Sequence, residues 1–358
     1  MKWLIRIGKV VLLAMIPLAI WLQFGEGNMV ARFVVSALAV LPIAAWIGTS
    51  TEHLAVRMGP TYGALFNATF GNFAEMVIAI LAIRAGLPSV VKASFTGSIL
   101  GNLLFVGGLS MIAGGWGRER QCFNMLAAES NAGQLVVAAA SLVVPTLFFS
   151  LVGGNRNLLR VHEVSIGTAV ILMVTYAAGL WFAFKTHQHI LNASADDNAP
   201  HHSGAQWSVR RSILVLLGSS VLMGVVAEGL VGAVEHVGHQ LGMNQVFLGF
   251  VVVAVVGNAA EHSTAIMLAR RDRMDAALGI VMQSSVQIAL FVTPLVVFLS
   301  YPLGHPLDLV FTSFEVVALA LGIAIFSYAV INGESHWFEG VQLLALYLIL
   351  AVAIFFLP

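Results

Sequence analysis

The chain has 358 residues, of which 59% are hydrophobic and only 9% are charged. Soluble domains carry about 25% charged residues, so this composition excludes a soluble globular protein. Lysine and arginine together number 17, as do aspartate and glutamate, and this balance gives no indication of nucleic acid as a partner. The sequence therefore predicts an all-α integral membrane protein embedded in the lipid bilayer.

Apolar runs of about 20 residues, the length that crosses a bilayer core, occur about eleven times along the chain. The first run has no small-residue cleavage site behind it and is expected to be a retained helix. We expect transmembrane helices at about residues 3–23, 30–49, 62–83, 93–113, 125–149, 164–184, 212–234, 246–268, 274–299, 309–331 and 337–357.

The loops between these runs predict the orientation and the organisation of the chain. With the N-terminus in the cytoplasm, the cytoplasmic segments hold twelve lysines and arginines and the outer loops hold five. Basic residues are enriched on the cytoplasmic side, so the count favours this orientation, and eleven spans then place the C-terminus outside. A polar stretch without apolar periodicity then divides the chain after the sixth span. We expect an additional N-terminal transmembrane helix at 1–25, a first five-helix repeat at 26–184, a cytoplasmic loop at 185–208 and a second repeat at 209–358.

A short motif supports this duplication. Gly-Asn-Phe-Ala-Glu at 71–75 returns as Gly-Asn-Ala-Ala-Glu at 257–261, which is 186 residues later. The same offset relates Ser98 to Ser284 and Glu129 to Glu315. Because each unit has five helices, the second copy would enter the membrane from the opposite side. Such inverted repeats place ion sites near the bilayer midplane.

Each motif places a carboxylate and an amide inside an apolar run, where ionisable groups usually line an ion path. The carboxylates and amides, with nearby hydroxyls, are the hard oxygen ligands that Ca²⁺ prefers. Each amide could instead bond between helices, and each hydroxyl could bond its own helix. The candidate cation-binding and proton-binding residues are Glu75, Glu261, Asn72, Asn258, Ser98, Ser284 and Gln287.

Two buried carboxylates repel each other and cannot readily remain charged without a cation. Protons and a metal ion would therefore compete for Glu75 and Glu261, which is the chemical basis of an antiporter. A Ca²⁺ ion or two protons would neutralise the pair. The empty site carries two negative charges, so the protein should not readily change between facing the cytoplasm and facing the outside while the site is empty.

Four further residues are candidates for gating or for a proton path. Glu228 lies inside a span and favours such a role. Glu129 and Glu315 lie near helix starts, where a carboxylate can serve equally well as a cap. His262 follows Glu261 directly and could influence it, but it could also be a hydrogen-bonded packing residue.

Several segments carry a resemblance to a known family. They are residues 67–75 (NATFGNFAE), 257–262 (GNAAEH), 97–105 (GSILGNLLF), 284–291 (SSVQIALF) and 337–340 (WFEG). These segments resemble the calcium/proton exchangers, the CAX branch of the cation/calcium antiporter superfamily. The resemblance implies that Glu75 and Glu261 are the central carboxylates and that tilting outer helices give alternating access.

We therefore expect a secondary antiporter, not an enzyme, that exchanges cytosolic Ca²⁺ for external protons in a bacterial inner (plasma) membrane. Ca²⁺ and protons would be its substrates, and no cofactor is expected. The sequence leaves open whether the protein forms a homo-oligomer. Coupling to sodium is an alternative, although the Gly-Thr-Ser and Pro-Glu residues typical of sodium-coupled relatives are absent. An intramembrane metal-dependent hydrolase is a second alternative, but it would usually need histidine ligands on a span.

Overall fold

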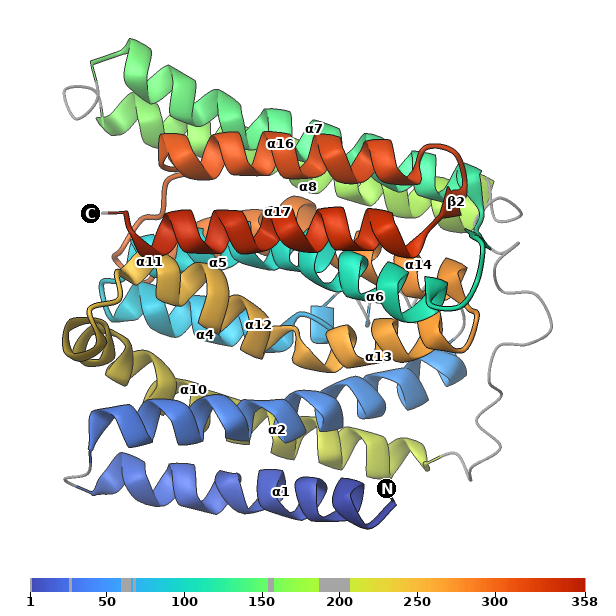
Figure 1. Ribbon diagram of the computed structural model, residues 1–358. Helices are drawn as coiled ribbons and strands as arrows, with labels where there is room; N and C mark the ends of the chain where they lie inside the picture. Colours follow the sequence, from blue (N-terminus) through green and yellow to red (C-terminus); the bar gives the residue numbers. More distant parts are fainter. Residues whose placement is uncertain are drawn as a thin grey trace. The chain divides into compact units, whose positions relative to one another are not determined.

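A computed structural model of the chain is nearly all-helical (Figure 1). It describes residues 2–25, 28–58, 66, 69–153, 158–186 and 207–357. Most of the predicted loop at 185–208, namely residues 187–206, lies outside the described residues.

The helices and strands follow one another along the chain in two stretches on either side of that loop. The first stretch contains α1 (Lys2–Phe24), α2 (Met29–Met58), α4 (Phe73–Arg84), α5 (Pro88–Leu100), the π-helix η1 (Gly101–Val106), α6 (Gly107–Gly115), β1 (Gln121–Cys122), α7 (Met125–Leu151), α8 (Leu158–Trp181) and the π-helix η3 (Phe182–Thr186). The second contains α10 (Val209–Leu241), α11 (Gln245–Phe247), the π-helix η5 (Leu248–Val253), α12 (Ala254–Gly257), α13 (Ala259–Arg270), α14 (Met274–Gln287), the π-helix η6 (Ile288–Val292), α15 (Thr293–Ser300), α16 (Ser313–Val330), β2 (Glu334–Ser335) and α17 (Trp337–Phe355).

Eight helices within the described ranges are long and apolar enough to cross a membrane, and a ninth span results if the run broken at Asn258 is counted as one. These nine match nine of the predicted spans. The predicted spans at 3–23 and 62–83 rest partly on residues whose side chains or backbone are not described. The fold class is thus confirmed as a helical membrane protein, while the count of eleven stays a prediction.

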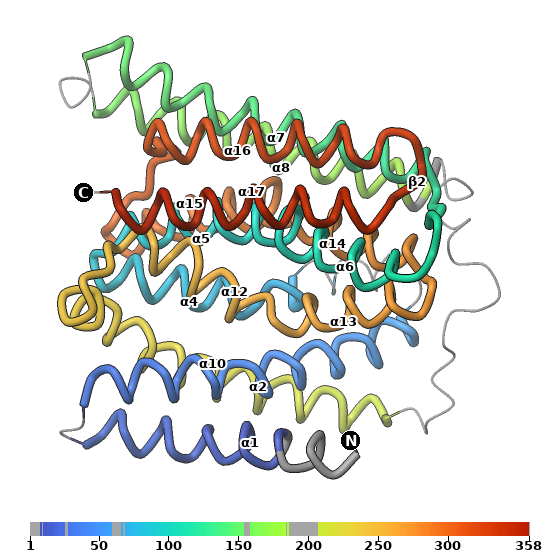
Figure 2. Tube along the Cα trace, viewed as in Figure 1, coloured from blue at the N-terminus to red at the C-terminus, as the bar shows by residue number. Residues whose placement is uncertain are grey.

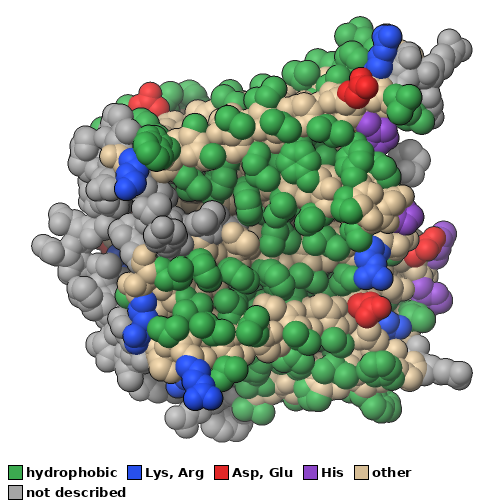
Figure 3. Space-filling model, turned by 180° about the vertical axis from the view of Figure 1, so that it is seen from behind, with side chains coloured by type: hydrophobic (Ala, Val, Ile, Leu, Met, Phe, Trp, Pro, Cys, Tyr) green, Lys and Arg blue, Asp and Glu red, His purple; other side chains and the backbone are tan. Residues whose placement is uncertain are grey.

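The surface has the character of a protein in lipid. On the face drawn in Figure 3, hydrophobic side chains cover the lengths of the helices, and charged side chains lie toward the left and right margins. Large apolar side chains such as Leu159, Tyr328 and Phe356 are strongly exposed. Exposure of this kind is stable in hydrocarbon and would be unfavourable in water.

Local signals set where several helices begin and end. Asn124 Oδ1 accepts a hydrogen bond from Ala127 N at 3.1 Å at the start of α7, and Ser208 Oγ accepts one from Arg211 N at 3.2 Å at the start of α10. These side chains satisfy backbone donors that a helix start leaves open. Gly242 ends α10 with φ of 66°, a left-handed conformation that glycine adopts without strain.

The chain forms two compact units, and each takes segments from both predicted repeats. The first unit comprises residues 1–94, 202–260 and 357–358, and the second comprises 95–201 and 261–356. In the first unit α2 lies along α10, α1 lies against α2, and α10 also contacts α4 (Figures 1 and 2). A Cβ added at Gly229 of α10 would lie 2.9 Å from Ser36 Oγ of α2, so the missing side chain permits this close approach.

In the second unit α17 packs against α6 and η1, while α16 and α14 both pack against α7. A Cβ added at Gly108 of α6 would lie 2.7 Å from the Gly340 carbonyl oxygen of α17, so glycine is required at this contact.

A short antiparallel pair of strands, β1 with β2, adds a detail that the all-α prediction did not contain. Beside it, Arg120 Nη1 donates to Glu334 Oε1 at 2.8 Å, and this hydrogen bond raises the pKa of the exposed Arg120 guanidinium.

The duplication seen in the sequence recurs in local structure. A helix break at Asn72 is matched by one at Asn258, 186 residues later. The π-helix η1 at 101–106 is matched by η6 at 288–292, again at nearly the same offset. Two segments with unrelated histories would have no reason to share both irregularities. The predicted inverted relation between the repeats, however, stays a prediction.

Candidate cation-binding site

The two motif asparagines interrupt their helices in the same way. Asn72 has φ of −99° and ψ of 21° just before α4, and Asn258 has φ of −94° and ψ of 4° between α12 and α13. Both fall in the sparsely populated bridge region of backbone conformation. Broken helices of this kind expose backbone groups that can bind ions within a membrane protein.

Each break places a helix start directly before a motif glutamate. Glu75 lies in the first turn of α4 and Glu261 in the first turn of α13. The partial positive charge of a helix N-terminus favours a carboxylate at this position. The fold therefore offers each carboxylate one source of compensation for its negative charge.

The candidate ligands are largely withdrawn from the surface. Glu75 is 9% exposed, and Asn72, Asn258, Ser98, Ser284 and Gln287 are each at most 4% exposed. Glu261 is half-buried, and its Oε2 atom is buried without a hydrogen-bond partner among the described residues. Buried carboxylate and amide groups need compensating partners, so this set is suited to holding a cation or protons.

The first unit brings the two motifs together. A Cβ added at Gly257 would lie 3.0 Å from Glu75 Oε1, so the carboxylate of the first motif lies against the glycine of the second. Asn258 Nδ2 donates to the Ala254 carbonyl oxygen at 2.9 Å. The amide oxygen is the atom of Asn258 suited to a cation, because the amide nitrogen can only donate.

The second unit contains a hydrogen-bonded network next to Glu261. The Ser284 hydroxyl interacts with the Glu261 carboxylate, and Asn102 Nδ2 donates to Ser284 Oγ at 3.1 Å. Asn102 Oδ1 lies 2.9 Å from His262 Nε2. An amide oxygen can only accept, so the His262 nitrogen is the donor. His262, Asn102, Ser284 and Glu261 thus form one chain of polar contacts.

Sequence reasoning did not assign a role to Asn102. It is 2% exposed and lies in η1, within the segment 97–105 that carried part of the family resemblance. A polar amide four residues after Ser98 in an apolar span was the available signal. Its importance became evident only from its two partners, which are 160 and 182 residues away in the sequence.

The other gating candidates have different surroundings. Glu315 is 3% exposed and accepts hydrogen bonds from Thr312 N at 2.9 Å and from Thr312 Oγ1 at 2.8 Å, which forms a capping box at the start of α16. Its second oxygen accepts from Thr96 Oγ1 at 3.2 Å. In the first unit, the exposed Glu228 accepts from Gln23 Nε2 at 3.2 Å. Glu129 is exposed on α7.

Comparison with known proteins identifies the family of the chain. The family model described as sodium/calcium exchanger protein matches residues 28–185 and 211–356. The Ca²⁺/H⁺ antiporter of Synechocystis is 38% identical and the Ca²⁺/H⁺ antiporter ChaA of Bacillus subtilis 36% identical; the alignments cover 97% and 98% of this chain and 97% and 99% of theirs.

A solved structure, that of native YfkE, has the same fold. It shares 34% sequence identity with this chain, the match covers 98% of this chain and 100% of YfkE, and the TM-score is 0.84. The chain belongs to the sodium/calcium exchanger protein family and is a homologue of its Ca²⁺/H⁺ antiporters.

Proposed function

We propose that the protein is a secondary antiporter that exports cytosolic Ca²⁺ in exchange for external protons. The observation that carries this proposal is the match along nearly the whole chain to relatives described as Ca²⁺/H⁺ antiporters. Two helix breaks, each followed by a glutamate in the next first turn, support it independently of the comparisons.

We further propose that Glu75 and Glu261 hold the transported ion together. Glu75 lies against Gly257, and Glu261 follows that glycine by four residues, which even an extended chain separates by at most about 14 Å. Asn72, Asn258, Ser98, Ser284 and Gln287 would supply further oxygens, since Ca²⁺ takes about six to eight of them. The inverted repeats would place this site near the bilayer midplane.

Exchange follows from competition at these oxygens. Ca²⁺ neutralises both carboxylates, and two protons do the same, so either loaded form can change its facing between the two sides of the membrane. The empty form carries two charges in a medium of low dielectric constant and changes facing much less readily. Ca²⁺ leaving on one side must then be replaced by protons, which prevents a leak.

Metal uptake into everted membrane vesicles tests this mechanism. An acid interior should drive Ca²⁺ uptake, and Glu75→Gln or Glu261→Gln should reduce it at least about a hundredfold, because each removes a charge that the cation requires. Glu163→Gln, at an exposed carboxylate of α8, is the matched control and should transport normally. Full transport by either motif variant would rule out the two-glutamate site.

The same vesicles distinguish the coupling ion. Replacing Na⁺ by choline at a constant pH gradient should leave Ca²⁺ uptake unchanged if protons are coupled. Loss of uptake in choline would instead favour the sodium-coupled alternative.

A tightly bound equimolar Zn²⁺ ion in the purified protein would favour the hydrolase alternative, in which a metal activates water.

A further inference from the structure

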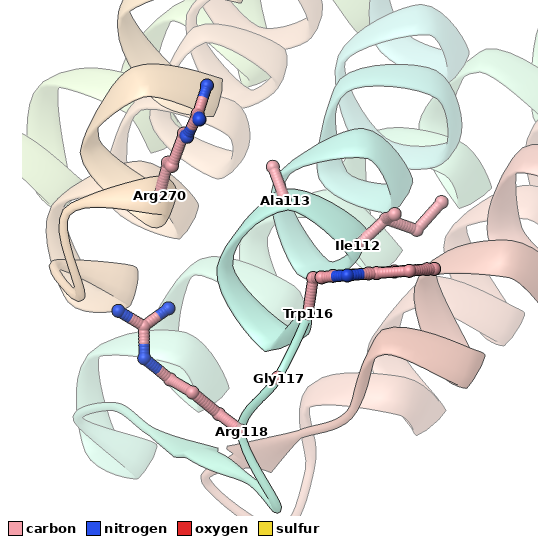
Figure 4. A pocket seen from close by; sticks show the side chains of 6 residues that line it. All are labelled: Ile112, Ala113, Trp116, Gly117, Arg118 and Arg270. Atoms are coloured by element: carbon pink, nitrogen blue, oxygen red, sulfur yellow. The ribbon is translucent and has the colours of Figure 1, made fainter.

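A pocket of about 650 Å³ opens on the second unit at the end of α6. It is lined by Ile112, Ala113, Trp116, Gly117, Arg118 and Arg270. In Figure 4 the Arg270 side chain projects from α13 and the Arg118 side chain extends to the same side of the pocket, while the ring of Trp116 and Ile112 lie on the other side. The pocket therefore combines a cationic wall with an apolar one.

The cationic wall holds two arginines, of which Arg118 has an ion-pair partner among the described residues and Arg270 has none. Arg118 Nε lies 3.4 Å from Asp272 Oδ1, but this oxygen also accepts a hydrogen bond from Gln121 Nε2 at 3.1 Å. The Arg270 side chain makes no ion pair or hydrogen bond with any residue in the described ranges. The described lining of the pocket thus holds two arginines and no acidic residue. The local field attracts an anion.

The apolar wall carries exposed aromatic side chains of the kind found at membrane interfaces. Trp116 is 74% exposed, and its ring meets that of Trp337 edge to face at 6.1 Å. Trp337 in turn contacts Phe338, and both are exposed at the start of α17. Exposed tryptophan at helix ends is typical of the boundary between lipid headgroups and acyl chains. Ile112 and Ala113 of α6 also line the pocket and extend its apolar wall.

We propose that this pocket binds an anionic phospholipid, with its phosphate between Arg118 and Arg270 and an acyl chain over Ile112 and Trp116. Guanidinium groups recognise phosphate oxygens through paired hydrogen bonds, and basic pockets at the ends of membrane helices attract anionic headgroups. A free phosphate would leave the exposed indole and the Ile112 side chain uncovered, whereas a lipid satisfies both walls. The site is independent of the transport mechanism proposed above.

Quenching of Trp116 fluorescence by brominated lipids tests the site in the full-length protein. The protein is reconstituted in phosphatidylcholine vesicles that contain increasing fractions of brominated phosphatidylglycerol or of brominated phosphatidylcholine. Each protein is compared with the same protein carrying Trp116→Phe, and the difference in quenching between the two is assigned to Trp116. Each arginine should raise the apparent affinity for phosphatidylglycerol over phosphatidylcholine about fivefold, which corresponds to about 1 kcal/mol.

The variants separate the pocket from general surface charge. Arg270→Gln should lose about fivefold in lipid preference, and Arg270→Lys should keep most of it, which shows that the change is not due to misfolding. Arg271→Gln removes the same charge one residue away, outside the pocket, and should keep the preference. Inorganic phosphate in excess should not displace the lipid.

Three outcomes would overturn the proposal. One is equal quenching by the two lipids in the unmodified protein. Another is an Arg270→Gln variant, eluting as a single species in gel filtration, that keeps the full preference. The third is complete displacement by inorganic phosphate, which would assign the pocket to a free anion.

Discussion

Gly257 links the two copies of the motif because its missing side chain lets Glu75 approach α12. A methyl group at this position would lie 3.0 Å from Glu75 Oε1, which is closer than ordinary van der Waals contact. Gly257→Ala should therefore displace the carboxylate while the helix itself accepts alanine well. We expect the KM for Ca²⁺ to rise about tenfold to a hundredfold, since a misplacement of 1 Å at a functional group has effects of this size.

Ca²⁺ uptake into everted vesicles measures this change. Gly218→Ala is the matched control, because a methyl group there would meet nothing within 4 Å on the described helices. An unchanged KM in Gly257→Ala would mean that the Glu75 position beside Gly257 is not the position that binds the ion.

Asn102 is the residue that connects His262 to Ser284. Asn102→Ala would leave a donor on His262 and an acceptor on Ser284 without their shared partner, and each loss in a buried setting costs about 1–3 kcal/mol. We expect lower thermal stability and a changed pH profile of Ca²⁺ uptake, because Ser284 would no longer be fixed beside Glu261.

A thermal unfolding assay together with uptake across a pH series checks this expectation. Ser110→Ala is the control, because Ser110 is fully buried in the same unit and its hydroxyl has no hydrogen-bond partner among the described residues. A pH profile that stays the same as that of the unmodified protein would reduce Asn102 to a packing residue.

At the scale of elements, the capping box of α16 addresses a question that the sequence left open for Glu315. Both carboxylate oxygens are engaged, one with Thr312 and one with Thr96 of α5. This arrangement favours a structural role that holds α16 against α5. Thr96→Val, which removes one hydrogen bond at constant volume, should lower stability by about 1 kcal/mol, and Glu315→Ala by about 2 kcal/mol.

Neither variant should change the KM for Ca²⁺ in vesicle uptake, and thermal unfolding should show the losses of stability. Thr175→Val is the control, because the half-buried Thr175 hydroxyl bonds the Ile171 carbonyl oxygen of its own helix and, among the described residues, no other helix. If Glu315→Ala lost transport at unchanged stability, the gating interpretation would replace the capping one.

The elements also show how far a linear pattern can predict structure. The long apolar runs predicted nine spans that the structure contains. In lipid a single segment can satisfy the hydrogen bonds of its own backbone only as a helix. For the helix breaks at Asn72 and Asn258, the sequence offered only the glycine that precedes each asparagine. The π-helices η1 and η6 had no signal at all, because one extra residue per turn leaves no trace in hydrophobicity.

At the scale of the whole molecule, the count of loop charges predicts a cytoplasmic N-terminus. Cys122 offers a direct measurement, because it is the only cysteine of the chain, it is exposed, and it lies in a loop assigned to the cytoplasm. An impermeant maleimide should label Cys122 in everted vesicles and leave it unlabelled in vesicles of native orientation.

A cysteine on the opposite side completes this experiment. His305 is exposed between α15 and α16, in a loop assigned to the outside. His305→Cys combined with Cys122→Ser should show the reverse labelling pattern. Labelling of Cys122 from the outside would invert the topology and, with it, the direction of transport that we propose.

The sequence by itself determined the membrane class and the duplicated Gly-Asn-x-Ala-Glu motif with its two carboxylates, because hydrophobic length and internal repetition are properties of a linear chain. Only the tertiary structure decided that Gly257 lies against Glu75, that Asn102 joins His262 to Ser284, and that Thr96 engages Glu315. These partners are 160 to 219 residues apart in the three hydrogen bonds. Contacts at such separations depend on how helices pack, and no local pattern records that packing.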